Sequence, residues 1–89
     1  MNDREWMEAK AHKMIASETK DQKINPYPCE LFGEGMIQAF YALGLLTDEE
    51  LARHTSALND AVSDRLIARL EEQITARHER VAIRAEQAA

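Results

Sequence analysis

Residues 39–58, AFYALGLLTDEELARHTSAL, decide the fold, because they contain the end of one helix and the start of the next. Gly44 stands where a glycine ends a helix by adopting a left-handed conformation. Thr47 can cap the following helix, and Glu50, three residues later, completes a capping box. Two leucines flank the cap at the positions of a hydrophobic staple, Leu46 and Leu51. These local signals predict a tight hairpin of two helices within residues 36–58.

The first helix of this hairpin extends back beyond residue 36. Apolar residues recur with helical spacing and predict a helix over about residues 29–43. Its expected core face consists of Phe32, Met36 and Phe40, widened by Ala39 and Leu43. Gly33 and Gly35 each cost up to about 1 kcal/mol relative to alanine inside a helix. They either delay the start of this helix or allow the close approach of another backbone.

The N-terminal part predicts a helix over about residues 3–20, followed by a non-helical loop over residues 21–28. Asn2 or Asp3 can cap the helix, and its narrow apolar stripe consists of Met7, Ala11, Met14 and Ile15. The loop contains Asn-Pro-Tyr-Pro at residues 25–28. Each proline restricts its own φ and disfavours helix at the residue before it, so this segment is extended and rigid.

The C-terminal part, about residues 48–85, contains no glycine or proline and predicts one long helix. The alternative is a break in this helix near residues 56–63, because Asn59 and Asp60 can begin a new helix there. Such a break would give a fourth helix. The sequence therefore belongs to the all-α class as a small three-helix or four-helix protein. We expect a helical hairpin followed by a long or bent C-terminal helix, within a single domain of residues 1–89.

The apolar stripe on the last helix is longer than one small chain can cover. Residues with the 3-4-7 spacing of a short coiled coil continue almost to its end, although Arg77 interrupts them. A twofold dimer would bury the stripe, whereas a monomer would leave it on a frayed tail. We expect the dimer, forming a helical bundle. Its expected interface residues are Leu66, Ile67, Leu70, Ile74 and Val81.

Length and composition predict a small cytoplasmic protein. Eighty-nine residues provide only a thin core. Cys29 is the single cysteine, and the start of the chain lacks the apolar run of a signal peptide, which favours a reducing compartment. No segment approaches the about 20 apolar residues of a membrane span, so we expect a soluble chain and no membrane partner.

The distribution of charge argues against nucleic acid as a partner. The net charge is −5, and residues 30–64 contain seven acidic residues against one base, Arg53. Phosphates attract basic surfaces, and the arginines that follow are interleaved with glutamates. The acidic middle would instead suit a basic groove on another protein.

Three groups of residues are candidates for metal binding or catalysis. Glu8 with His12, and Glu50 with His54, have the i,i+4 spacing that brings a carboxylate and an imidazole to one helix face. This spacing suits metal ligands, but ordinary ion pairs on the helix surface explain it too. Glu50 also serves the capping box. Cys29 near a helix start resembles an activated thiol, but no base accompanies it. We therefore expect no catalytic residue, no metal site and no cofactor.

The expected function is a non-catalytic protein-binding module, a small helical adaptor, regulator or inhibitor that works through its surface as a homodimer. One version is an acidic inhibitor of a nucleic-acid-binding machine, of the kind encoded by phages and plasmids. The alternatives are a DNA-binding transcriptional regulator that uses the 36–58 hairpin and an accessory subunit of an enzyme. The expected contacts with a protein partner of unknown identity are Trp6, Tyr27, Tyr41, Asp48, Glu49 and Glu50.

Overall fold

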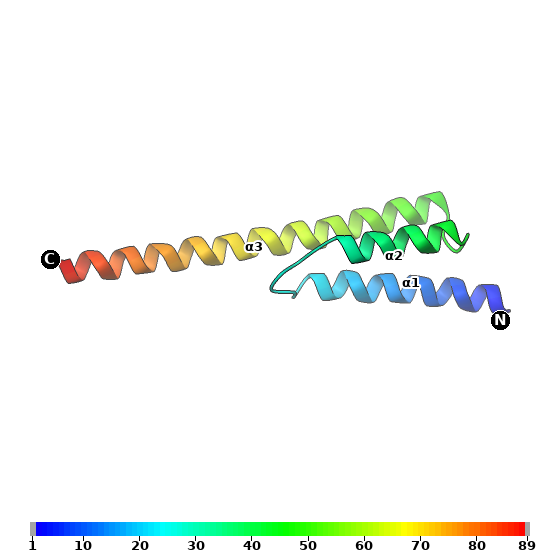
Figure 1. Ribbon diagram of the computed structural model, residues 1–89, viewed down its shortest axis with the longest axis horizontal. Coiled ribbons are helices and arrows are strands. Elements are labelled where there is room, and N and C mark those ends of the chain that lie inside the picture. The colour runs from blue at the N-terminus through cyan, green and yellow to red at the C-terminus, as the bar shows by residue number, and fades with distance from the viewer. Residues whose placement is uncertain (1, 89) are drawn as a thin grey trace.

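The computed structural model describes residues 2–88 and contains three helices over that range, so the all-α class is confirmed. They are α1 (Asp3–Gln22), α2 (Leu31–Ala42) and α3 (Asp48–Ala88). Figure 1 shows α1 and α2 lying beside the first half of α3, while the second half of α3 continues alone. We call residues 2–65 the head and residues 66–88 of α3 the arm.

Helix α1 begins where its sequence provides a cap. The side chain of Asn2 accepts a hydrogen bond from the Glu5 backbone N–H at 2.7 Å, which satisfies one of the free donors of the first turn. Within the expected apolar stripe only Ala11 and Ile15 are buried, and both are 1% exposed. Met7 and Met14 remain largely exposed, so the stripe is narrower than the sequence pattern predicts.

Helix α2 begins at Leu31, two residues later than expected, and its inner face differs from the prediction. Ile37 is 1% exposed and Gly33 is buried, whereas Phe32, expected in the core, is 67% exposed. The reason is the packing of Gly33, where an added Cβ would lie 2.6 Å from Leu58 Cδ2. Since Gly33 faces α3, the neighbouring Phe32 points about 100° away from it around the helix.

The turn between α2 and α3 has the expected geometry. Gly44 has φ of 75°, and the N–H groups of Gly44 and Leu45 donate to the carbonyls of Tyr41 and Phe40, which is a Schellman motif. The capping box is also confirmed. The Glu50 N–H donates to Thr47 Oγ1 at 3.1 Å, and Glu50 Oε1 accepts from the Thr47 N–H at 2.8 Å.

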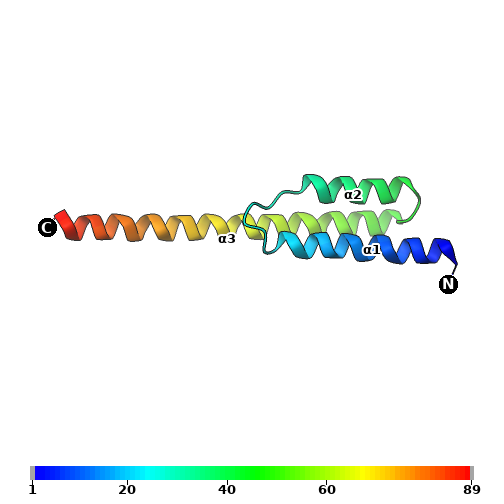
Figure 2. The ribbon, with the colours of Figure 1, turned by 60° about the horizontal axis from the view of Figure 1, so that its bottom comes forward.

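Helix α3 is unbroken over 41 residues, so the fourth helix that a break would have created is not present in residues 2–88. At 1.5 Å per residue, α3 is about 61 Å long. The molecule measures 73 × 20 × 15 Å, and Figure 2 shows the same projecting arm from another side. Leu58 and Val62 stand on either side of Asn59 and Asp60, and both are buried in the core of the head. Their packing keeps the helix continuous through the polar pair.

The core is small and lies entirely within the head. Its buried cluster consists of Ile15, Ile37, Leu46, Leu58 and Val62, and the partly buried residues packed against it are Met36, Phe40 and Leu51. All three helices contribute to it, and the two leucines of the expected staple take part. Within the described residues, none of the helices combines the length and the apolar character that a bilayer span requires.

Candidate protein-binding surface

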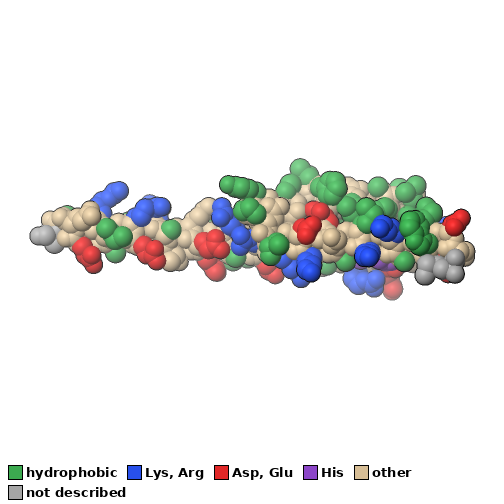
Figure 3. Space-filling view, turned by 90° about the horizontal axis from the view of Figure 1, so that it is seen from below, with side chains coloured by type: hydrophobic (Ala, Val, Ile, Leu, Met, Phe, Trp, Pro, Cys, Tyr) green, Lys and Arg blue, Asp and Glu red, His purple; other side chains and the backbone are tan. Residues whose placement is uncertain are grey.

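The arm has an uncovered apolar stripe. All five residues expected at a dimer interface lie on it and are about half exposed, namely Leu66 (52%), Ile67 (56%), Leu70 (56%), Ile74 (46%) and Val81 (59%). Ile83, also on the arm, is 54% exposed. In the face that Figure 3 presents, hydrophobic side chains cover much of the head and alternate with charged side chains along the arm. The stripe therefore offers a long, narrow surface to another helix.

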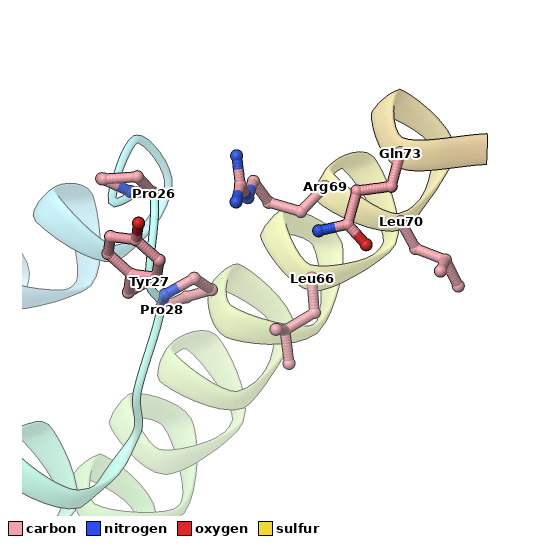
Figure 4. Close-up of a pocket in the computed structure, with 7 residues that line it drawn as sticks. All are labelled: Pro26, Tyr27, Pro28, Leu66, Arg69, Leu70 and Gln73. Atoms are coloured by element: carbon pink, nitrogen blue, oxygen red, sulfur yellow. The ribbon is translucent and has the colours of Figure 1, made fainter. Parts of the chain in front are cut away.

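A groove lies where the arm leaves the head. Its volume is about 490 Å³, and it is lined by Pro26, Tyr27, Pro28, Leu66, Arg69, Leu70 and Gln73. Figure 4 shows the loop residues on one side of the groove and the α3 residues on the other. Because Leu66 and Leu70 belong to both the groove and the stripe, the two form one continuous surface.

Three contacts hold the loop of the groove in place. The buried side chain of Gln22 accepts a hydrogen bond from the Cys29 N–H at 2.9 Å, which ties the end of α1 to the loop. Arg65 Nε donates to the carbonyl of Asn25 at 3.0 Å. The guanidinium of Arg69 lies over the Tyr27 ring, 5.8 Å from its centre, as in a cation–π contact. The groove is therefore formed by fixed residues of both the loop and α3.

The residues expected to contact a protein partner separate into two groups. Tyr27, which is 80% exposed, lies at the groove. The others are at the opposite end of the head, where α1 begins and the α2–α3 turn lies, as Figure 1 shows. This second group consists of Trp6, Tyr41, Asp48, Glu49 and Glu50. No single surface of the head includes both groups.

Two of the acidic residues in the second group have contacts within the chain. Asp48 accepts a hydrogen bond from the Tyr41 hydroxyl at 2.5 Å, and this bond raises the pKa of Tyr41 above its usual value. Glu50 serves the capping box, and the Thr47 N–H in that box is the main reason that the pKa of Glu50 is lowered. Glu49 is exposed and has neither role. The negative charge at this end therefore stabilises the start of α3 as well as facing solvent.

The two Glu–His pairs meet through their histidines. His12 Nδ1 lies 2.7 Å from His54 Nε2, and His12 Nε2 lies 2.7 Å from Glu50 Oε2. With both rings neutral, His54 Nε2–H donates to His12 Nδ1, and His12 Nε2–H donates to Glu50. Glu8 does not join them, because it pairs with Arg4 at 3.0 Å. Burial, followed by the charges of His12 and Arg53, lowers the pKa of His54.

This cluster has the geometry of hydrogen bonds rather than of a metal centre. Two nitrogens on a tetrahedral zinc ion stand about 3.3 Å apart, given Zn–N distances of 2.0–2.1 Å. The 2.7 Å between the two rings is shorter, and both nitrogens of His12 already have partners. Within residues 2–88, no three His, Cys, Asp or Glu side chains are grouped to hold a metal ion. The cluster therefore joins α1 to α3.

Cys29 is exposed in the loop and is not part of a helix. It precedes the first turn of α2, which begins at Leu31, so the structure does not place its thiol at a helix N-terminus. Its backbone N–H contributes to the loop through Gln22. The structure thus assigns a positioning role to its main chain.

Comparisons with known proteins give no relative: no protein-family model matches the chain, and neither curated proteins nor solved structures yield a significant match.

Several contacts of this surface have no local signal in the sequence. Arg65 and Asn25 are 40 residues apart, and His12 and His54 are 42 residues apart. The arginines of α3 are expected to form a solvated, ion-paired face. Arg65 and Arg69 do lie near Glu72, but they also hold the loop.

Proposed function

We propose that this chain is a non-catalytic protein-binding module that dimerises through its arm and presents the head to a separate protein partner. The observation that carries the proposal is the apolar stripe on the arm, which α1 and α2 leave uncovered. Most helices in proteins owe their stability to the docking of an apolar face rather than to intrinsic propensity. A second helix on the stripe would supply that docking.

The stripe has enough apolar surface for association of moderate strength. Complete burial of a large aliphatic side chain is worth about 1.5–3 kcal/mol, so burial of the exposed half is worth about 1 kcal/mol. The five stripe residues of each copy would together contribute about 10 kcal/mol to a dimer. The loss of translational and rotational freedom costs roughly 4–15 kcal/mol. We therefore expect a dimer that dissociates on dilution.

The far end of the head is the proposed site for the separate partner. Trp6 is 60% exposed there, at the same end of the head as the acidic first turn of α3. The carboxylates at this end suit a basic protein surface, because charge steers association, and the exposed aromatic residue adds a side-chain type that is enriched at binding hot spots. An acidic inhibitor of a nucleic-acid-binding protein is the form of this proposal that uses the charge most directly.

The proposal is tested by measuring the molar mass of two matched variants with light scattering during gel filtration. Leu70→Asp places a charge on the stripe, and Thr75→Asp places the same charge at an exposed position outside it. We expect Leu70→Asp to be monomeric, and Thr75→Asp to keep the mass of the unmodified protein. Both should keep a cooperative thermal unfolding transition by circular dichroism, which shows that the head remains folded. Equal masses for all three proteins would overturn the proposal.

A further inference from the structure

The apolar stripe and the charges of the arm specify how the second copy lies. We infer that two copies pair their arms antiparallel, so that Leu70 of each packs against Val81 of the other. This inference rests on the proposed function, because it requires the arm to be a dimerisation helix. It adds the orientation and the register.

The charges on the seam argue against a parallel pair. With Ile67, Leu70, Ile74 and Val81 on the seam, the same seven-residue spacing places Arg77 and Arg84 on it as well. In a parallel pair with matched register, each of these arginines would face its own copy across the axis. Two like charges at each of two layers would then oppose association.

An antiparallel pair gives both arginines an acidic neighbour. With Leu70 opposite Val81, Arg77 lies opposite Ile74 of the other copy and Arg84 lies opposite Ile67. The flanking positions next to those isoleucines, one turn earlier, contain acidic residues, Glu71 and Asp64. Each arginine can then extend to a carboxylate of the other copy. The antiparallel orientation therefore separates the like charges that the parallel orientation brings together.

The orientation is tested by disulfide trapping in a Cys29→Ser background, which removes the native thiol. Leu70→Cys and Val81→Cys are purified separately and oxidised with a glutathione redox buffer, alone and mixed. We expect a covalent dimer only in the mixture. At 1.5 Å per residue, the two Leu70 positions of an antiparallel pair are about 16 Å apart along the axis, too far for a disulfide.

The outcomes separate this inference from the proposed function. Covalent dimers from each variant alone would show a parallel pair, which overturns the inference and leaves dimerisation intact. A dimeric mass without any covalent product would overturn the stated register. A monomeric mass for the unmodified chain would overturn the proposed function itself.

Discussion

Gly33 and Gly35 provide the sharpest test of how α2 packs on α3. A Cβ at Gly33 would lie 2.6 Å from Leu58 Cδ2 and 3.1 Å from Leu58 Cδ1, whereas a Cβ at Gly35 would meet nothing within 4 Å. Leu58 is 0% exposed and has little room to move. The same substitution by alanine should therefore have opposite effects at two positions only two residues apart.

The magnitudes follow from two effects. Replacing a helical glycine with alanine stabilises the helix by up to about 1 kcal/mol, and both positions receive this gain. Forcing an extra methyl group into a packed core costs about 1–3 kcal/mol, and only Gly33 incurs that cost. Gly33→Ala should thus be less stable than Gly35→Ala by about 1–3 kcal/mol. In a domain of this size each 1 kcal/mol shifts the melting temperature by about 4–8 °C.

The assay is thermal and urea unfolding followed by circular dichroism at one protein concentration. Gly35→Ala should melt above the unmodified protein and Gly33→Ala below Gly35→Ala. Leu58→Val removes both clashing methyl carbons, so in that background Gly33→Ala should lose its penalty. Equal stabilisation by the two alanines in the unmodified background would refute the packing of Gly33 against Leu58.

Three further predictions concern the contacts that join the helices. Because burial lowers the pKa of His54 from 6.5, the unfolded chain binds the proton more readily, so this contribution is complete above about pH 6.5 and is lost as the pH falls. Melting temperatures between pH 7.5 and 5.5 should depend less on pH in His54→Gln than in the control His78→Gln, and equal slopes would contradict this. Glu50→Ala should lower the melting temperature because it removes the capping box and the contact with His12, whereas Glu49→Ala, without either contact, should not; equal melting temperatures would rule out this role. Arg65→Ala should cost about 1–2 kcal/mol in urea unfolding through the lost hydrogen bond to the loop, and an unchanged midpoint would show that the bond contributes nothing.

The local parts of this fold could be predicted from the sequence. The Schellman turn at Gly44 and the capping box at Thr47 depend on residues within a few positions of one another. Such motifs satisfy backbone groups at helix ends wherever the helices later pack. The long apolar stripe of α3 could be predicted for a similar reason, because helical spacing alone defines it.

The parts of the fold that depend on how the helices are rotated against each other could not be predicted from the sequence. The helical spacing of apolar residues predicted Phe32 in the core. In the structure, the close approach at Gly33 turns Ile37 inward and Phe32 outward. The meeting of His12 and His54 depends on the alignment of α1 along α3, for which residues 42 positions apart give no periodic signal. The sequence also left α3 open to a break, and the burial of Leu58 and Val62 explains why it stays continuous.

The central claim is that another helix covers the arm, and amide hydrogen exchange tests it most directly. In the unmodified protein at high concentration, the amides of residues 70–81 should exchange far more slowly than those of an isolated helix, and dilution should speed their exchange. The core amide of Leu58 should change less, because the head retains its own packing. Fast exchange along residues 70–81 at every concentration, with a protected head, would contradict the account.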